Sequence, residues 1–281
     1  SVFARLLRGE AHHIGYPHNF TIYDTDDAKS VLKSIIKEMA LDETAYKPNV
    51  VYNRISQAKN RLISWQDYLN DPILAGEDAA SMKPEIGNIY RAYSQRCFKA
   101  GAMDFDDILY NTDLLFRNHL DVLNKYQHRI QYILVDEYQD TSGTQNRIVE
   151  LLINFWEKPN VFVVGDDDQS IYRFQGANIE NMLQFANNYK KHLFTVVLTD
   201  NYRSTQPILN ISQTIIGRNE DRLVKKIPGL SKELAAAGPS MHLDHPPLLR
   251  EYESQRLEMI GIAAEVRELV SRGVSPGNIG I

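Results

Sequence analysis

The sequence predicts an α/β fold in which a right-handed parallel sheet follows a mostly helical segment. From residue 130 onward, apolar runs of strand length alternate with stretches of helical pattern. The runs at 132–135 and 161–164 lack polar alternation, which is typical of strands buried on both faces of a parallel sheet. Residues 26–129 instead carry apolar residues at intervals of three and four, which is typical of amphipathic helices.

The composition bounds the kind of protein. The chain has 281 residues, of which 43% are hydrophobic and 24% charged, as expected for one large or two modest globular domains. With a net charge of −5, any nucleic-acid partner must be held by a local basic patch. The single cysteine, Cys97, excludes an internal disulfide and a multi-cysteine zinc site. A lone cysteine fits the reducing cytoplasm. The sequence shows no apolar run long enough for a membrane span and no signal-peptide pattern at its start.

The helical segment starts at the acidic pair Asp26 and Asp27, directly before an apolar stripe in "DDAKSVLKSIIKEMA". Gly101 is expected to separate two helices within residues 85–116. The carboxylates of "DFDD", residues 104–107, are interpreted as capping or solvating the second of these helices rather than as metal ligands.

The part after residue 130 continues the alternation of strand and helix. We expect helices at 145–156, 205–216 and 254–272, and further strands at 194–199, 248–254 and 278–281. Residues 228–247 are rich in Pro, Gly, Ala and Ser and predict a loop. The last elements would begin a second βαβ unit.

Polar side chains follow the first strands of the expected sheet at the point where each strand ends. They are Asp136 and Glu137, then Asp166, Asp167, Asp168 and Gln169, then Tyr202 and Arg203. Open α/β sheets bind ligands at this edge, so these groups are expected to lie close together. Together these side chains could supply a Mg²⁺ ligand, a group that orients water and a cation. Phosphoryl transfer requires such a set. The alternatives are an acidic pair that caps the next helix and a solvated acidic turn.

Three stretches resemble motifs II, III and IV of the UvrD/Rep/PcrA-type superfamily 1 DNA helicases: "VDEYQDTSGTQ", "VVGDDDQSIYRFQGA" and "LTDNYRST". The opening "SVFARLLRGEAHHIGYPHNFTIYD" resembles the stretch after motif Ia, and "MDFDDIL" resembles a helix of the family. The resemblance implies a fragment of an ATP-dependent 3′–5′ DNA helicase that unwinds duplex DNA in repair or replication. Its cofactors would be ATP and Mg²⁺, and its partners single-stranded DNA and the junction with duplex DNA.

The resemblance also implies a domain organisation, a RecA-like parallel sheet with an inserted, mostly helical subdomain. Residues 1–22 would belong to RecA-like domain 1A, and residues 23–110 to a helical 1B-like subdomain. Residues 111–205 would return to domain 1A with motifs II and III and the start of motif IV. Residues 206–281 would begin RecA-like domain 2A.

For the ATP site, the resemblance implies a role for each polar residue at the strand ends. Asp136 would hold Mg²⁺, and Glu137 would polarise the attacking water. Gln169 would sense the γ-phosphate, Arg203 would be the arginine finger, and Tyr202 would stack on adenine. For Arg203 the alternative is a surface or helix-capping arginine.

For DNA, the resemblance implies that Tyr172 and Phe174 pack against bases of the single strand, a contact that tolerates any sequence. Their alternative role is core packing. Phe174 stands where the family usually has Trp. Gln175 stands where it usually has Arg, which leaves one expected backbone contact without its cation.

One family feature does not occur in the 281 residues, the phosphate loop G-x-x-x-x-G-K-[ST]. A P-loop NTPase needs this loop to hold the phosphates and Mg²⁺. We therefore expect a fragment of a larger helicase that is inactive as an ATPase by itself. The alternative is a non-catalytic DNA-binding or interaction module.

Two other groups of residues suggest binding. Residues 46–65 carry four cations and no acidic residue up to Trp65, and they form either a basic patch for duplex DNA or a solvated helix face. The cations are Lys47, Arg54, Lys59 and Arg61. The histidines at 12, 13, 18, 242 and 245 match no closed zinc pattern and are not interpreted as metal ligands.

Overall fold

The computed structural model describes residues 2–170, 179–239 and 241–281. Within these residues helices dominate, and the strands form small parallel pairs, β1 with β2, β3 with β4 and β5 with β6. The chain divides into two compact units, residues 1–194 and 195–281. The predicted α/β class and the helical character of residues 26–129 are confirmed.

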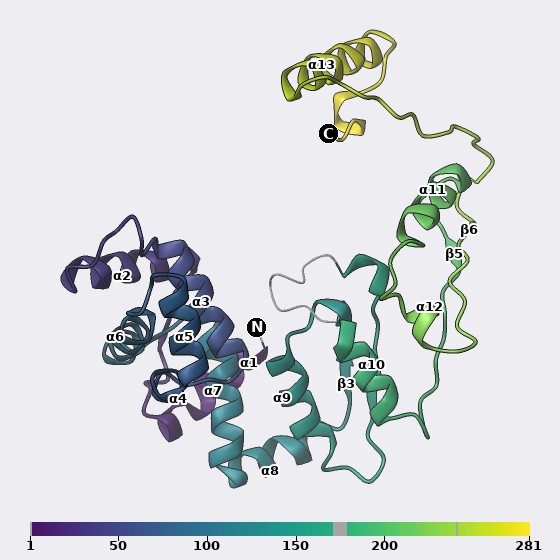
Figure 1. Ribbon diagram of the computed structural model, residues 1–281. Coiled ribbons are helices and arrows are strands. Elements are labelled where there is room, and N and C mark those ends of the chain that lie inside the picture. The colour runs from purple at the N-terminus through teal and green to yellow at the C-terminus, as the bar shows by residue number, and fades with distance from the viewer. Residues whose placement is uncertain (1, 171–178, 240) are drawn as a thin grey trace. The chain divides into compact units, whose positions relative to one another are not determined.

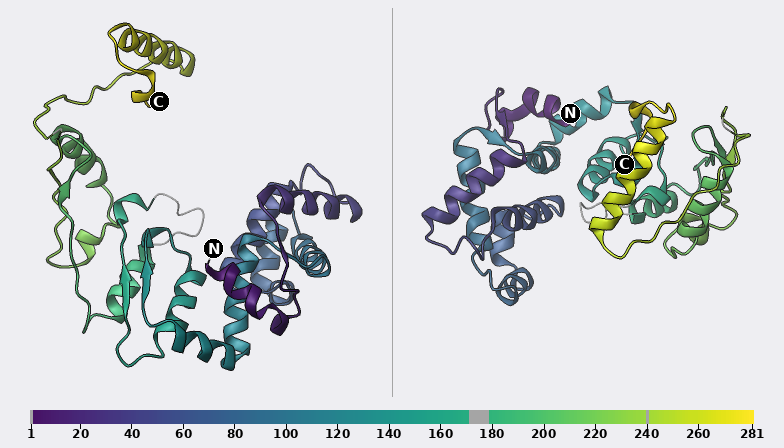
Figure 2. Two further views of the ribbon diagram at one scale, coloured as in Figure 1. Left: turned by 180° about the vertical axis from the view of Figure 1, so that it is seen from behind. Right: turned by 90° about the horizontal axis from the view of Figure 1, so that it is seen from above.

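The first unit contains a helical core built from residues 25–99, whose purple and blue helices lie together in both views of Figure 2. The helices are α2 (Thr25–Glu38), α3 (Pro48–Asn60), α4 (Trp65–Asn70), α5 (Pro72–Ala80) and α6 (Ile86–Lys99). Asp24 caps α2, because its carboxylate accepts hydrogen bonds from the amides of Asp26 and Asp27. The helix therefore begins at Thr25, one residue before the acidic pair that was predicted to start it, and Asp24 and Asp27 form a capping box.

A second core in the same unit joins the first helix to later ones; Figure 1 shows α1, α7 and α9 near the label N, with α8 below them. It is formed by α1 (Val2–Glu10), η1 (Ala11–Ile14), α7 (Phe105–Asn118), α8 (Leu120–Arg129) and α9 (Gly143–Ile153). The short pair β1 (Thr21–Ile22) and β2 (Ala102–Met103) adds Met103 to this core. Gly101, with φ of 60°, separates helix α6 from helix α7 as predicted.

The strands that carry the first two groups of predicted site residues are β3 (Ile133–Val135) and β4 (Val161–Val163). They pair in parallel, with Leu134 opposite Phe162. The expectation that both faces are buried is wrong, because Leu134 is 75% exposed and Phe162 62% exposed, while the residues on either side of each are half-buried. One face of the pair packs against the second core through Ile133, and no described element covers the other face.

After this pair come η2 (Tyr138–Asp140) at the end of β3, α9, η3 (Asp167–Gln169) at the end of β4, and α10 (Ile179–Asn188). Ser142 caps α9 through a capping box with Gln145. Thus each strand end turns tightly into a helix, which keeps the polar residues that follow the strand close to its last hydrogen bonds.

The second unit has its own small parallel pair, β5 (Asp200–Asn201) and β6 (Ala235–Ala236). Its helices are α11 (Gln206–Ile216), α12 (Leu223–Lys226) and α13 (Gln255–Ser271), followed by η5 (Pro276–Asn278). The helices predicted at 205–216 and 254–272 are confirmed, but residues 194–199, 248–254 and 278–281 are not strands. Apolar β-branched runs favour strands only where a neighbouring strand completes their hydrogen bonds, and here none does within the described residues. The described helices include none that could cross a lipid bilayer.

Candidate functional site at the ends of β3 and β4

Asp136 and Glu137 lie where β3 ends, and both side chains are exposed. The β3–β4 hydrogen bonds continue to this point: the amide of Val164 donates to the carbonyl of Val135 (2.9 Å), and the amide of Tyr138 donates to the carbonyl of Val164 (2.8 Å). The two acidic residues therefore lie in the short turn that spans the last hydrogen bonds of the strand pair. Neither carboxylate caps α9, whose cap is Ser142, so the helix-capping alternative does not hold.

Glu137 adopts a backbone conformation that residues other than glycine rarely take, with φ of 49° and ψ of 47°. Such a left-handed residue costs on the order of 1–3 kcal/mol and persists where its surroundings enforce it. Here the amide of Glu137 donates to Oδ1 of Asp136 (3.0 Å), and its carbonyl accepts from the amide of Asp140 (2.9 Å). These hydrogen bonds hold the backbone of Glu137 at the strand end, while its side chain is exposed.

Gln139 connects this turn after β3 to the end of β4. The side chain is buried, with 1% of the residue exposed. Its Nε2 donates to Oε2 of Glu137 (2.7 Å), and its Oε1 accepts from the backbone amide of Asp166 (3.0 Å). The segment after β3 and the segment after β4 are thereby joined by one side chain.

The turn after β4 places Gln169 near the same strand end. Asp166 caps the turn η3: its Oδ1 accepts from the amide of Asp168 (3.1 Å), and its Oδ2 accepts from Nε2 of Gln169 (2.8 Å). The carboxylate oxygens of Asp166, Asp167 and Asp168 lie within 4.8 Å of one another. Asp167 is buried, so the acidic run is not a simple solvated turn.

The structure brings Asp136, Glu137 and Gln169 together at the ends of one strand pair, but Tyr202 and Arg203 belong to the other unit. Both of the latter are exposed and follow β5, where Asn201 Oδ1 accepts from the amides of Arg203 (3.0 Å) and Ser204 (2.8 Å). The expectation that a single sheet edge carries all three groups is therefore wrong for the described strands, because β5 pairs with β6. Arg203 does not cap α11, which begins after Thr205.

Tyr172, Phe174 and Gln175 lie outside the described residues. Their predicted contacts with single-stranded DNA stay a prediction.

The donor set at the strand ends fits Mg²⁺, which prefers carboxylate oxygens together with water. Asp136 offers an exposed carboxylate whose one hydrogen bond within the described residues uses Oδ1. Asp136 would therefore be the residue to hold the ion. No group of three possible donors in the described residues includes a histidine, and His18 Nδ1 instead lies 2.7 Å from the carbonyl of Arg8.

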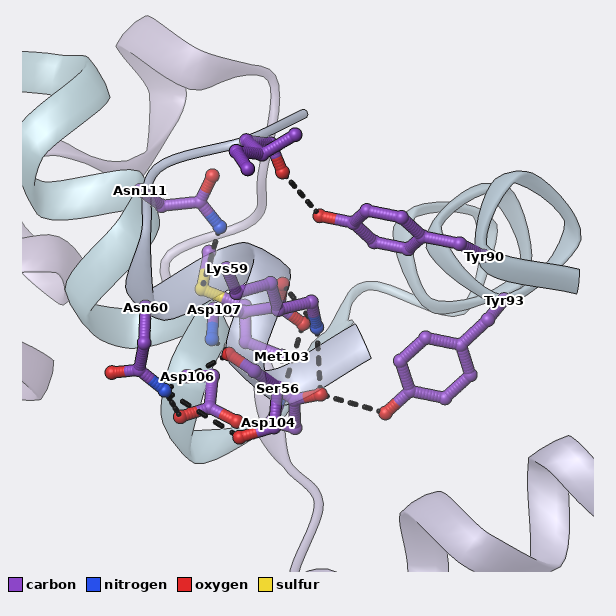
Figure 3. Close-up of polar contacts among 11 residues, drawn as sticks. Ser56, Lys59, Asn60, Tyr90, Tyr93, Met103, Asp104, Asp106, Asp107 and Asn111 are labelled. Carbon is purple, nitrogen blue, oxygen red and sulfur yellow. Dashed lines mark hydrogen bonds and ion pairs between the residues drawn. The ribbon is translucent and has the colours of Figure 1, made fainter. Parts of the chain in front are cut away.

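Neither alternative for residues 46–65, a basic patch or a solvated helix face, holds for two of the four cations, Arg54 and Lys59. Arg54 donates to Oε2 of Glu77 (2.7 Å), Oδ1 of Asp78 (3.1 Å) and the hydroxyl of Tyr68 (2.9 Å). Lys59 is buried and lies 2.7 Å from carboxylate oxygens of both Asp104 and Asp107. Figure 3 shows this lysine pointing toward the two carboxylates. Asp104, which accepts its hydrogen bond, lies 45 residues later in the chain. Lys47 and Arg61 are exposed.

The residues around Lys59 also contact the segment that follows the site. The hydroxyl of Thr144, in the first turn of α9, donates to the backbone carbonyl of Asn60 at the end of α3 (2.8 Å). The side chain of Asn60 donates in turn to Oδ1 of Asp106 (2.9 Å). Helix α9, which follows Glu137 in the chain, is therefore hydrogen-bonded to the helical core of residues 25–99.

Comparison with known proteins decides the family. A family model described as the UvrD/REP helicase N-terminal domain matches residues 1–190. The chain belongs to the UvrD/REP helicase family.

Among curated UvrD/REP relatives, the ATP-dependent DNA helicase PcrA of Leuconostoc citreum is 39% identical over 223 residues, which cover 79% of this chain and 29% of that protein. PcrA of Staphylococcus epidermidis is 39% identical over 225 residues, covering 80% of this chain and 30% of that protein. PcrA of Staphylococcus aureus is 38% identical over 226 residues, with the same coverage. The chain thus spans less than a third of the length of these relatives, and the resemblance drawn from the three motifs is confirmed.

Sequence reasoning on this UvrD/REP chain missed Gln139 and did not foresee the buried ion pairs of Lys59. A signal for Gln139 was present, because an uncharged amide stands between the acidic residues of "DEYQD" and can both donate and accept hydrogen bonds. No local signal marks Lys59, since its partners are distant in sequence.

Proposed function

We propose that this chain is part of the motor of an ATP-dependent 3′–5′ DNA helicase that unwinds duplex DNA in the cytoplasm during repair or replication. The observation that carries the proposal is the exposure of Asp136, Glu137 and Gln169 at the carboxyl ends of the paired strands β3 and β4. Ligands of parallel α/β sheets bind at that edge. The names of the PcrA relatives support ATP as the fuel and DNA as the substrate.

In this proposal, ATP binds with its γ-phosphate at the ends of β3 and β4. A magnesium ion held by Asp136 would supply charge neutralisation for the phosphates. Glu137 accepts a proton from the attacking water and orients it, while the amide of Gln169 contacts the γ-phosphate. Arg203 supplies a cation for the transition-state charge, and Tyr202 stacks on adenine.

The proposal extends to the domain organisation and the DNA site. Residues 1–22 and 111–205 form part of RecA-like domain 1A, residues 23–110 form subdomain 1B, and residues 206–281 begin domain 2A. The core that α1 shares with α7, α8 and α9 supports the link between the first two ranges. Tyr172 and Phe174 stack on bases of single-stranded DNA, next to the junction with duplex DNA.

The experiment that tests the proposal is Glu137→Gln in the intact helicase that contains this chain. The amide keeps the size of the side chain but cannot accept the proton of the water. We expect DNA-stimulated ATP turnover to fall by about 10²-fold or more, while ATP binding, measured with a fluorescent nucleotide, stays within about threefold. A variant that keeps most of the wild-type turnover would show that Glu137 has a structural role only.

A second candidate function is a DNA-binding or interaction module without catalysis. The observation that favours it for residues 1–281 alone is the absence of a G-x-x-x-x-G-K-[ST] loop from their sequence. Binding of a single-stranded oligonucleotide by these residues, without any ATP turnover by the intact protein, would favour this candidate over the motor.

A further inference from the structure

Gln139 is an uncharged polar side chain placed between the two segments that carry the proposed catalytic groups. It is 1% exposed, and both ends of its amide are used: Nε2 donates to Oε2 of Glu137 (2.7 Å), and Oε1 accepts from the amide of Asp166 (3.0 Å). Because each hydrogen bond requires the opposite end of the amide, the orientation of this amide is determined by its partners. The rotated amide would place a donor against a donor and an oxygen against a carboxylate.

The surroundings of Gln139 leave its amide little freedom to move. A Cβ atom added at Gly165 would lie 2.8 Å from Oε1 of Gln139 and 3.3 Å from its backbone nitrogen. The backbone on either side is held as well, since Tyr138 donates to the carbonyl of Val164 (2.8 Å). Gln139 is therefore a rigid group, whereas the Glu137 carboxylate that it contacts is exposed.

The contacts of Gln139 extend to the second proposed catalytic group. Asp166, whose amide donates to Gln139, accepts a hydrogen bond from Nε2 of Gln169 through its Oδ2 (2.8 Å). A continuous series of hydrogen bonds thus runs from Glu137 through Gln139 and Asp166 to Gln169. Its two ends are the group assigned to the water and the group assigned to the γ-phosphate.

We propose that Gln139 is a positioning residue: it aims the carboxylate of Glu137 at the attacking water and fixes that aim relative to the turn that carries Gln169. This inference rests on the proposed function, since it assigns Gln139 a task that exists only if Glu137 is the base. An exposed glutamate can occupy several rotamers, and misplacing a reacting group by about 1 Å can cost on the order of 10²-fold in rate. Gln139 removes this freedom through its hydrogen bond to Glu137.

The test uses Gln139→Glu in the intact helicase. The new side chain has the same length and still accepts from the amide of Asp166, but it presents a carboxylate to Glu137 instead of a donor. We expect kcat for DNA-stimulated ATP hydrolysis to fall by about 10²-fold, with KM for ATP within about threefold, because the Glu137 carboxylate loses the donor that orients it and faces a like charge instead. Gln139→Met, uncharged and of similar length, should lower kcat in the same way, and it replaces Gln139→Glu if that protein does not fold.

Gln145→Glu is the matched control. Gln145 lies six residues further along and uses its Oε1 to accept from the amide of Ser142, a role that a glutamate performs equally well. This variant should keep wild-type kcat and KM.

A double-mutant cycle separates positioning from general structural damage. If Gln139 acts through Glu137, adding Gln139→Met to Glu137→Gln should lower kcat by no more than about twofold beyond Glu137→Gln alone, because the base is already absent. Independent, multiplicative losses would overturn the inference, as would a wild-type kcat in both Gln139 variants. These outcomes leave the proposed function intact, whereas wild-type turnover of Glu137→Gln alone would overturn both.

Discussion

The ammonium of Lys59 lies 2.7 Å from Oδ2 of Asp104, and each of the two side chains is 2% exposed. The same carboxylate oxygen accepts a hydrogen bond from the hydroxyl of Tyr93 (2.8 Å). Burial by itself lowers the pKa of Lys59, but the carboxylates of Asp104 and Asp107 raise it well above its ordinary value. A charged lysine on α3 therefore joins α6 and the start of α7, and through Asn60 and Thr144 this cluster reaches α9.

Replacing Lys59 by methionine should destabilise the protein. The apolar stem is kept, but the buried carboxylates lose their cation, and removing one partner of a buried ion pair costs about 3–5 kcal/mol. We expect a loss of about 3 kcal/mol in the free energy of unfolding, measured by urea denaturation at pH 8. Lys33→Met, at an exposed position on α2, is the control and should change the free energy by less than about 0.5 kcal/mol. Equal effects of the two substitutions would contradict the role of the buried pair.

Asp107 should make stability depend on pH between about 4 and 7. Burial, followed by the neighbouring Asp104 carboxylate, raises the pKa of Asp107 from 3.8 to about 7. The folded protein therefore holds a proton that the unfolded chain releases at lower pH, so the contribution of this group to stability is full below pH 3.8 and is lost as pH rises to about 7.

Asp107→Asn should remove this dependence, because the amide resembles the protonated carboxyl at every pH. The unfolding free energy of the variant, compared with that of the wild type, should rise steadily from pH 4 to pH 7 and then stay level. Asp104 contributes with the opposite sign, since burial raises its pKa but Lys59 lowers it further, and it is present in both proteins. A difference between the two proteins that is constant over this range would refute the prediction.

Two substitutions in the intact helicase should separate DNA binding from turnover. Phe174→Ala should weaken binding of single-stranded DNA by about 1–3 kcal/mol, the range for one stacked base, and leave ATP affinity without DNA nearly unchanged. Arg203→Ala should leave DNA binding intact but strongly reduce ATP turnover, because its cation serves the transition state. The measurements are titrations with a fluorescent oligonucleotide and with nucleotide. Loss of both activities in both variants would indicate that these residues support the fold.

Residues 1–281 alone should not hydrolyse ATP at a helicase-like rate. Without a phosphate loop, the lysine and backbone amides that position and neutralise the phosphates are missing from the polypeptide, and positioning supplies most of catalysis in this chemistry. The assay is phosphate release by the purified 281-residue chain with and without single-stranded DNA. DNA-stimulated turnover by this chain would defeat the fragment interpretation.

Much of the local structure followed from the sequence because its causes are local. The apolar stripe from Val31 to Met39 and the preceding acidic residues predicted α2, and the same logic predicted α9, α11 and α13. The interpretation of "DFDD" as a helix start is confirmed, because Asp104 and Asp107 form a capping box. Hydrogen bonds of this kind link residues three apart, so they can be recognised in any context.

Strand pairing could not be predicted in the same way. The run at 194–199 has the composition of a buried strand, yet the strand that follows it, β5, consists of Asp200 and Asn201 and pairs with β6. Likewise, nothing near Leu134 indicates that its side chain is 75% exposed. Whether an apolar run becomes a strand, and which of its faces is covered, depends on elements far away in the chain.

The sequence by itself determined the family, the positions of α2, α9, α11 and α13 to within a few residues, and the residues at the ends of β3 and β4, because motifs and helix caps depend on the order of neighbouring residues. Only the tertiary structure decided which groups meet: Gln139 with Asp166, and Lys59 with Asp104. It also showed that two of the four cations in an apparently basic stretch, Arg54 and Lys59, are paired with carboxylates. The physical reason is that burial and charge pairing act between side chains brought together by folding, and their energies depend on distance and solvent exposure rather than on separation along the chain.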